Sequence, residues 1–160
     1  MTIVIIILVL IAFFAIVISV NNKQMKEAGF EQKDFISSMK FMSDHPLITK
    51  QQICNVCVKE KVLHIMTVGY KKLGEIDGGS IKTIIVEDES TFEKKVTLAR
   101  LALVGIFAFG IKKKKKNEIA YLTISWNDDR FDYSTIFEFE GVGSLHKANL
   151  VKSKIIMRIK

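Results

Sequence analysis

The sequence predicts an α+β protein, mainly antiparallel β, that follows an N-terminal transmembrane helix. Three observations lead to this fold class. No charged residue occurs before Lys23, so all 24 basic and 17 acidic residues, and the net charge of +7, belong to the rest of the 160-residue chain. From Ile53 onward, short β-rich runs alternate with turn signals. The C-terminal residues carry an apolar stripe at helical spacing.

The first element is an apolar run from Ile3 to Val20 with one polar member, Ser19. As a helix it would rise about 27 Å, close to the ~30 Å hydrocarbon core of a bilayer. A cleaved signal peptide is disfavoured, because the run lacks a basic segment before it and a small-residue cleavage site after it. We expect residues 1–22 to form a retained transmembrane anchor.

The charges that flank this run predict its orientation. Lys23, Lys26, Lys33 and Lys40 all follow the run, and only Met1 and Thr2 precede it. Lysine and arginine are retained on the cytoplasmic side. We therefore expect a single-pass protein of the cell membrane, with its N-terminus outside and its C-terminal domain in the cytoplasm.

Residues 23–45 are expected to be a juxtamembrane connector. A short helix capped by Asp34 would place four apolar side chains on one face, namely Phe35, Ile36, Met39 and Met42. Pro46 ends this helix, because the residue before a proline is biased away from helix. The folded domain is then expected to span residues 46–160.

Within that domain the apolar pattern predicts strands followed by one helix. The predicted strands are Ile53–Val58, Val62–Val68, Tyr70–Ile76, a buried Ile81–Glu87, Ile119–Trp126 and Tyr133–Glu140. Turns are expected at Lys59–Lys61, Asp77–Gly79 and Asn127–Asp129. Ser144 is expected to cap a final amphipathic helix whose stripe is Leu145, Ala148, Val151, Ile155 and Ile159.

Five short segments carry a resemblance to a known family. They are Val86–Thr91, Arg100–Phe109, Lys112–Lys116, Tyr121–Ile124 and Ile136–Phe139. Together they resemble a group of small Gram-positive membrane-anchored proteins with a bacterial pleckstrin-homology-like (PH-like) domain. The resemblance implies a PH-like barrel or sandwich with an inserted apolar helix and a C-terminal amphipathic helix. The layout of anchor and domain is also similar to that of the sublancin immunity protein, without residues that map to an immunity role.

The insertion is the candidate binding element. Its apolar stretch, Leu101–Ile111, would reach about 17 Å as a helix, which is too short to cross a bilayer. One interpretation is a helix packed on the domain with solvated lysines. In the other, Phe107 and Phe109 enter the membrane interface while five lysines contact anionic lipid, namely Lys112, Lys113, Lys114, Lys115 and Lys116. Nucleic acid is not expected as a partner, because aromatics do not interleave the basic block.

No pattern in the chain predicts catalysis. Cys54 and Cys57 have C-x-x-C spacing, but three positions apart in a strand they point to opposite faces and cannot share a bridge or a metal. His64 is expected to be a partly buried strand residue, and Asp128 and Asp129 to form a turn. We expect no catalytic residue, no metal ligand and no cofactor, and therefore a protein that is not an enzyme.

These observations lead to two functional hypotheses. The first is a membrane-tethered binding module on the cytoplasmic face, whose partners are the lipid bilayer, through anionic head groups, or another membrane protein. The alternative is an immunity factor that protects against a membrane-acting bacteriocin or toxin, and it rests on the similar layout alone.

Overall fold

The structure is a computed structural model and describes the backbone of residues 2–99 and 118–160. Its elements, in chain order, are α1 (Thr2–Glu27), β1 (Phe35–Ser43), β2 (Gln52–Lys59), β3 (Val62–Thr67), β4 (Lys72–Asp77), the short 3-10 helix η1 (Gly78–Ser80), β5 (Ile81–Asp88), α2 (Glu89–Ala99), β6 (Ile119–Asn127), β7 (Asp132–Glu140) and α3 (Ser144–Ile159). The predicted α+β class is confirmed, with an apolar helix first, strands next and a helix last.

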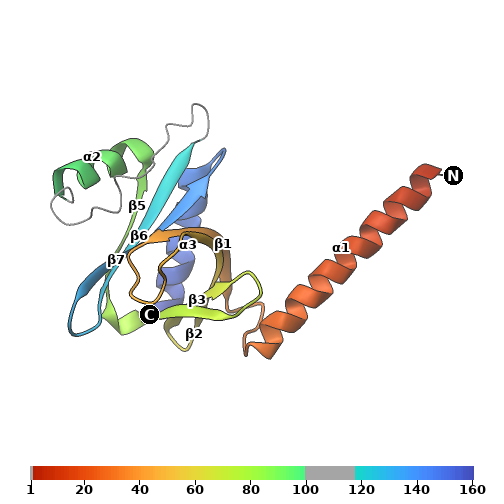
Figure 1. The fold of residues 1–160 in the computed structure, drawn as a ribbon, viewed down its shortest axis with the longest axis horizontal. Helices are drawn as coiled ribbons and strands as arrows, with labels where there is room; N and C mark the ends of the chain where they lie inside the picture. Colours follow the sequence, from red (N-terminus) through yellow and green to blue (C-terminus); the bar gives the residue numbers. More distant parts are fainter. Residues whose placement is uncertain (1, 100–117) are drawn as a thin grey trace.

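The seven strands form one antiparallel sheet in the order β4-β3-β2-β1-β7-β6-β5. Strands β1 to β4 pair in chain order, as do β5 to β7, and β1 pairs with β7 to join these two halves, so that β4 and β5 are the edge strands. Helix α3 packs against strands from both halves of the curved sheet (Figure 1). The core between them holds fully buried side chains such as Phe41, Leu63, Leu122, Phe137 and Ile155.

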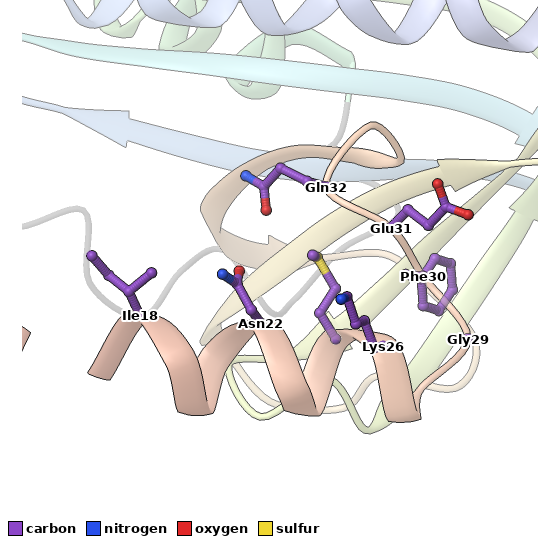
Figure 2. A pocket seen from close by; sticks show the side chains of 8 residues that line it. Ile18, Asn22, Lys26, Gly29, Phe30, Glu31 and Gln32 are labelled. Atoms are coloured by element: carbon purple, nitrogen blue, oxygen red, sulfur yellow. The ribbon is translucent and has the colours of Figure 1, made fainter. Parts of the chain in front are cut away.

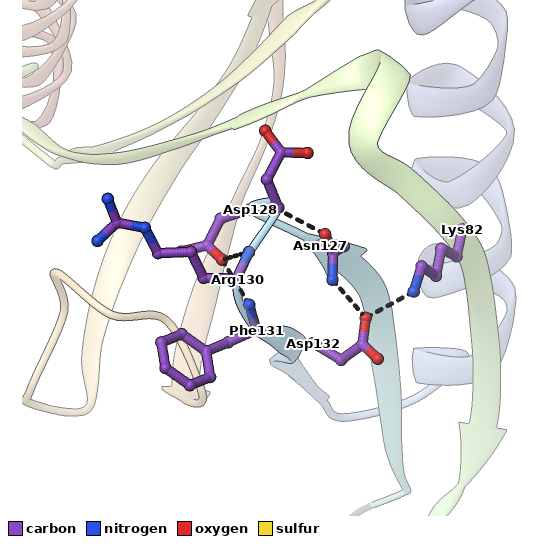
Figure 3. A network of polar contacts seen from close by, with 7 residues as sticks. Lys82, Asn127, Asp128, Arg130, Phe131 and Asp132 are labelled. Atoms are coloured by element: carbon purple, nitrogen blue, oxygen red, sulfur yellow. Dashed lines mark hydrogen bonds and ion pairs between the residues drawn. The ribbon is translucent and has the colours of Figure 1, made fainter.

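Two of the predicted turns form hairpins, the first at residues that rarely adopt the required conformation and the second at residues that favour it. In the β2–β3 hairpin, Glu60 and Lys61 take positive φ angles of 53° and 65°, as a two-residue hairpin turn requires. In the β6–β7 turn, the side-chain oxygen of Asn127 accepts from the amide of Asp129 at 2.7 Å, and that of Asp128 accepts from the amide of Phe131 at 2.8 Å (Figure 3). The turn interpretation of Asn127–Asp129 is confirmed.

The expected helix over residues 34–42 is wrong, because Phe35–Ser43 is strand β1, which pairs with β2 on one side and β7 on the other. A β-bulge explains the misleading pattern. Between Phe35 and Ser37, β1 advances two residues while β2 advances one. Because of the extra residue, Ile36 and Met39 are both buried although they are three positions apart. This spacing resembles that of a helix. The carboxylate of Asp34 accepts from the amide of Glu31 at 2.8 Å and caps no helix there.

Two finer expectations are also corrected. Strand β5 is an edge strand rather than a buried one, and of its apolar residues only Ile84 is buried. Ser144 does not cap α3. Gly143 occupies the N-cap position in the left-handed conformation, at φ 71°, while Ser144 is the first helical residue and is buried.

Helix α2 covers part of the sheet face opposite α3. Its N-terminus is capped by Asp88, whose carboxylate accepts from the amide of Thr91 at 2.8 Å. Phe92 stacks on Tyr121, with 4.2 Å between ring centroids, and Ile136 is fully buried beside them. The face of β7 that carries Ile136, Glu138 and Glu140 is therefore partly buried.

The loop after β1 ties the edge strand β4 to the other half of the sheet through His45. The ring lies 5.4 Å from the Trp126 ring, its Nδ1 accepts from the amide of Leu47 at 3.2 Å, and its Nε2 lies 3.3 Å from the carbonyl oxygen of Glu75. Because Nδ1 is an acceptor, the neutral ring carries its proton on Nε2 and donates it to that carbonyl. Gly74 makes room for the ring, since a Cβ there would lie 2.3 Å from its Cε1 atom.

Candidate membrane-proximal site

Helix α1 presents its apolar side chains outward rather than to the sheet. From Val4 to Val20 every residue is exposed, with Val4, Leu10 and Ile18 each at least half exposed. Within the described residues, the segment Val4–Glu27 is the one helix that is long and apolar enough to cross a membrane. In Figure 1 it extends away from the sheet.

The C-terminal end of α1 is packed on the domain. Met25 is only 2% exposed and lies in a cluster with Phe30, Cys57, Met66 and Tyr70, which we call the junction cluster. Seven residues, 28–34, separate α1 from β1. They are tied down at both ends, because the Lys59 ammonium donates to the carbonyl of Gly29 at 2.7 Å and the Val58 amide donates to the carbonyl of Asp34 at 2.8 Å.

The turn between β3 and β4, which we call the 67–71 turn, lies against the same end of α1. The Tyr70 hydroxyl interacts with the Asn21 side chain, and Gly69 faces the Gln24 side chain, which would lie 3.9 Å from a Cβ at this glycine. Thr67 closes the turn, because its carbonyl accepts from the amide of Tyr70 and its hydroxyl accepts from the amide of Lys71. Tyr70 is held at a φ of 60°, a conformation that bulky residues adopt only when packing requires it.

A groove of about 830 Å³ runs between α1 and the segment 29–32. Figure 2 shows its lining, which is Ile18, Asn22, Met25, Lys26, Gly29, Phe30, Glu31 and Gln32. Ile18 belongs to the apolar run, whereas Asn22, Lys26 and Gln32 are polar. Met25 and Phe30 are apolar as well, so apolar and polar side chains are mixed along the groove.

The charges around this junction are unevenly neutralised. Lys23 lies 3.8 Å from Glu27, and Lys33 lies 2.9 Å from Glu31. The hydrogen bond from Lys33 lowers the pKa of the Glu31 carboxyl, which therefore stays ionised. For Lys26 and Lys71, no carboxylate lies within ion-pair distance among the described residues. Two lysines beside the end of the apolar helix are thus available to an external anion.

The structure does not describe the binding residues that were expected from the sequence. Phe107, Phe109 and the lysines 112–116 are outside the described residues. Sequence reasoning missed Asn21, Met25, Phe30 and Tyr70, which build the junction. The available signal was that Met25 and Phe30 are the only large apolar residues in the polar stretch 21–34.

The cysteines behave as structural residues. Cys54 lies in the main core and Cys57 in the junction cluster, on opposite faces of β2, as the strand periodicity predicted. Burial raises the pKa of the Cys54 thiol to about 12 and that of Cys57 to about 11. Reactive thiols have lowered pKa values, so these two are inert at neutral pH. Among the described residues, no group of three or more His, Cys, Asp or Glu side chains is placed to hold a metal.

Comparison of the chain with protein-family models, with curated proteins and with solved structures found no match.

Proposed function

We propose that this chain is a membrane-tethered interaction module, anchored by α1 with its N-terminus outside the cell and its sheet domain on the cytoplasmic face. Its partner is the anionic inner leaflet or another membrane protein. One observation carries the proposal: an apolar helix whose side chains are exposed from Val4 to Val20 ends directly on the folded domain through the buried Met25. A soluble protein would cover such a helix, because exposing this much apolar surface to water is costly.

A PH-like architecture for the domain fits the observed topology. Seven antiparallel strands in one curved sheet, followed by a single C-terminal helix packed across both halves, agree with what the sequence resemblance implies. Lys23 and Lys26, directly after the apolar run, support the proposed orientation.

A non-enzymatic role is supported by the state of the titratable groups. The two thiols have raised pKa values, and burial lowers the pKa of both His45 and His64. Both ring nitrogens of His45 contact backbone groups, and these contacts hold the sheet together. These groups therefore serve packing, whereas a nucleophile or general base needs its reactive atom in reach of a substrate.

Membrane extraction and protease protection test the proposal. The full chain with a C-terminal epitope should stay in the membrane fraction after an alkaline carbonate wash. The epitope should survive protease added to protoplasts and be destroyed in inverted vesicles. The variant Ile7→Lys/Ile11→Lys, which places two charges mid-helix, should become extractable. Release of the unaltered chain by carbonate, or digestion of the epitope in intact protoplasts, would contradict the anchor or the orientation. The immunity hypothesis stays a prediction.

A further inference from the structure

We propose that the 67–71 turn is a second membrane contact, which lies in the head-group layer of an anionic leaflet with Val68 in the interface and Lys71 beside lipid phosphates. The inference rests on the proposed function, since it needs α1 to be in the bilayer. It concerns residues that the basic block at 112–116 does not include.

The depth of the turn follows from its contacts with α1. The apolar run ends at Val20, and the turn lies beside Asn21 and Gln24 of α1. At 1.5 Å per residue, Gln24 lies about 6 Å beyond Val20 along the helix axis. The head-group region of each leaflet is roughly 5–7 Å thick. A turn at this level therefore lies among head groups, and Tyr70 occupies the depth at which tyrosine is enriched in membrane proteins.

The side chains of the turn suit that layer. Val68 is 56% exposed, and Ile53 is 62% exposed. The two residues lie on neighbouring strands, each one position beyond the paired residues Cys54 and Thr67. Both side chains lie on the sheet face on which α1 packs, because each is two residues from Asn55 or Met66, which pair on that face. Two neighbouring apolar side chains at one end of a sheet gain nothing from water, whereas their burial at a membrane interface is stabilising.

The charge on this surface favours an anionic leaflet over a protein partner. Lys71 is exposed and, among the described residues, has no carboxylate in ion-pair range, while its neighbour Lys72 is held by Glu75 at 2.8 Å. Lys26 on α1 is likewise available. The hydrogen bonds that Thr67 accepts from the amides of Tyr70 and Lys71 hold the turn in one conformation, so little conformational entropy is lost when the turn contacts lipid.

Site-specific photo-crosslinking in nanodiscs tests this inference on the full chain. Benzoylphenylalanine replaces Val68 in one variant, Leu10 of α1 in a second and Phe131 in a third. Phe131 is 64% exposed in the β6–β7 turn, which lies on the far side of the domain from α1 in Figure 1. Lipid adducts are expected at positions 10 and 68 and not at 131. Adducts at 10 without adducts at 68 would overturn the second contact alone. Absence of adducts at 10 would overturn the proposed anchor and this inference with it.

The preference for anionic lipid is measured with the same Val68 probe in phosphatidylglycerol and phosphatidylcholine nanodiscs. The adduct yield should be higher in phosphatidylglycerol, and Lys71→Gln should reduce that difference about five-fold, the equivalent of about 1 kcal/mol for one lysine near a charged leaflet. Lys154→Gln, at an exposed position on α3, is the matched control and should leave the difference unchanged. Equal yields in the two lipids, or equal effects of the two substitutions, would refute the role of Lys71.

Discussion

The contact between Gly74 and His45 permits a sharp test of how the sheet is held together. In Gly74→Ala the new Cβ would lie 2.3 Å from Cε1, 2.8 Å from Nε2 and 3.0 Å from Nδ1 of His45. Three ring atoms are involved, so the ring has to move and give up its bonds to the Leu47 amide and the Glu75 carbonyl. Overpacking costs about 1–3 kcal/mol and each lost hydrogen bond about 0.5–1.5 kcal/mol. We expect Gly74→Ala to lower the free energy of unfolding by about 3 kcal/mol.

A double-mutant cycle separates this clash from other effects of alanine. His45→Ala alone should cost about 2 kcal/mol through lost hydrogen bonds and ring burial. In the double variant the new methyl group occupies space that the ring has vacated. The double variant should therefore cost little more than His45→Ala alone, and the two single costs should not add.

The assay is denaturant unfolding of the full chain in mild detergent, followed by the fluorescence of Trp126, the single tryptophan. Its ring lies 5.4 Å from the His45 ring, so the signal reports on the same region. Gly69→Ala is the matched control, because a Cβ there makes only ordinary contacts at 3.9 Å. Additive costs in the cycle, or a Gly74→Ala variant as stable as Gly69→Ala, would refute the reasoning.

Three further predictions follow from the same structure. Burial lowers the pKa of His45 and His64 in the folded state, so the unfolded chain binds protons at a higher pH than the folded chain does. The free energy of unfolding should therefore fall as the pH drops below about 6.5. Denaturation midpoints at pH 8 and pH 5.5 measure this fall, and His45→Gln should make it smaller. Met25→Ala should cost about 2 kcal/mol locally, at the low end for core methionines because the site is near the surface, and hydrogen exchange at the amide of Phe30 should speed up while amides of β6 stay protected. A fragment 46–160 should fail to fold because it lacks β1 between β2 and β7, whereas fragment 21–160 should give dispersed amide resonances.

The fold was predictable where local chemistry decides the structure. The β6–β7 hairpin follows from two β-rich runs around the turn formers Asn127–Asp129, and the polar network of Lys82, Asn127 and Asp132 in Figure 3 confirms why the turn forms there. The β2–β3 hairpin follows from two β-rich runs separated by three charged residues. Strand β1 was missed because a bulge shifts its periodicity from two to three between Ile36 and Met39. A bulge is visible only in the pairing with β2, which a single sequence does not display.

The candidate site was less predictable because its residues meet only in three dimensions. A block of lysines is obvious in a sequence, and so is an apolar run. The burial of Met25, in contrast, depends on Met66 and Tyr70, which are about forty residues away and reach it through the docking of α1 on the sheet. The packing of His45 between the two halves of the sheet likewise needs Gly74 and Trp126, which belong to two different strands.

The central position of β1 changes how the tether acts on the domain. A long flexible linker would confer only a high effective concentration at the membrane and leave the orientation of the domain free. Here α1 is followed within seven residues by β1, the strand that pairs with both β2 and β7. With α1 in a bilayer, as proposed, the packing of Met25 and Phe30 on the sheet would therefore fix which face of the domain meets the membrane. A tilt of the helix in the membrane would then turn the whole domain and move the 67–71 turn with it, so under the proposed function the junction cluster would set the orientation of the domain at the membrane.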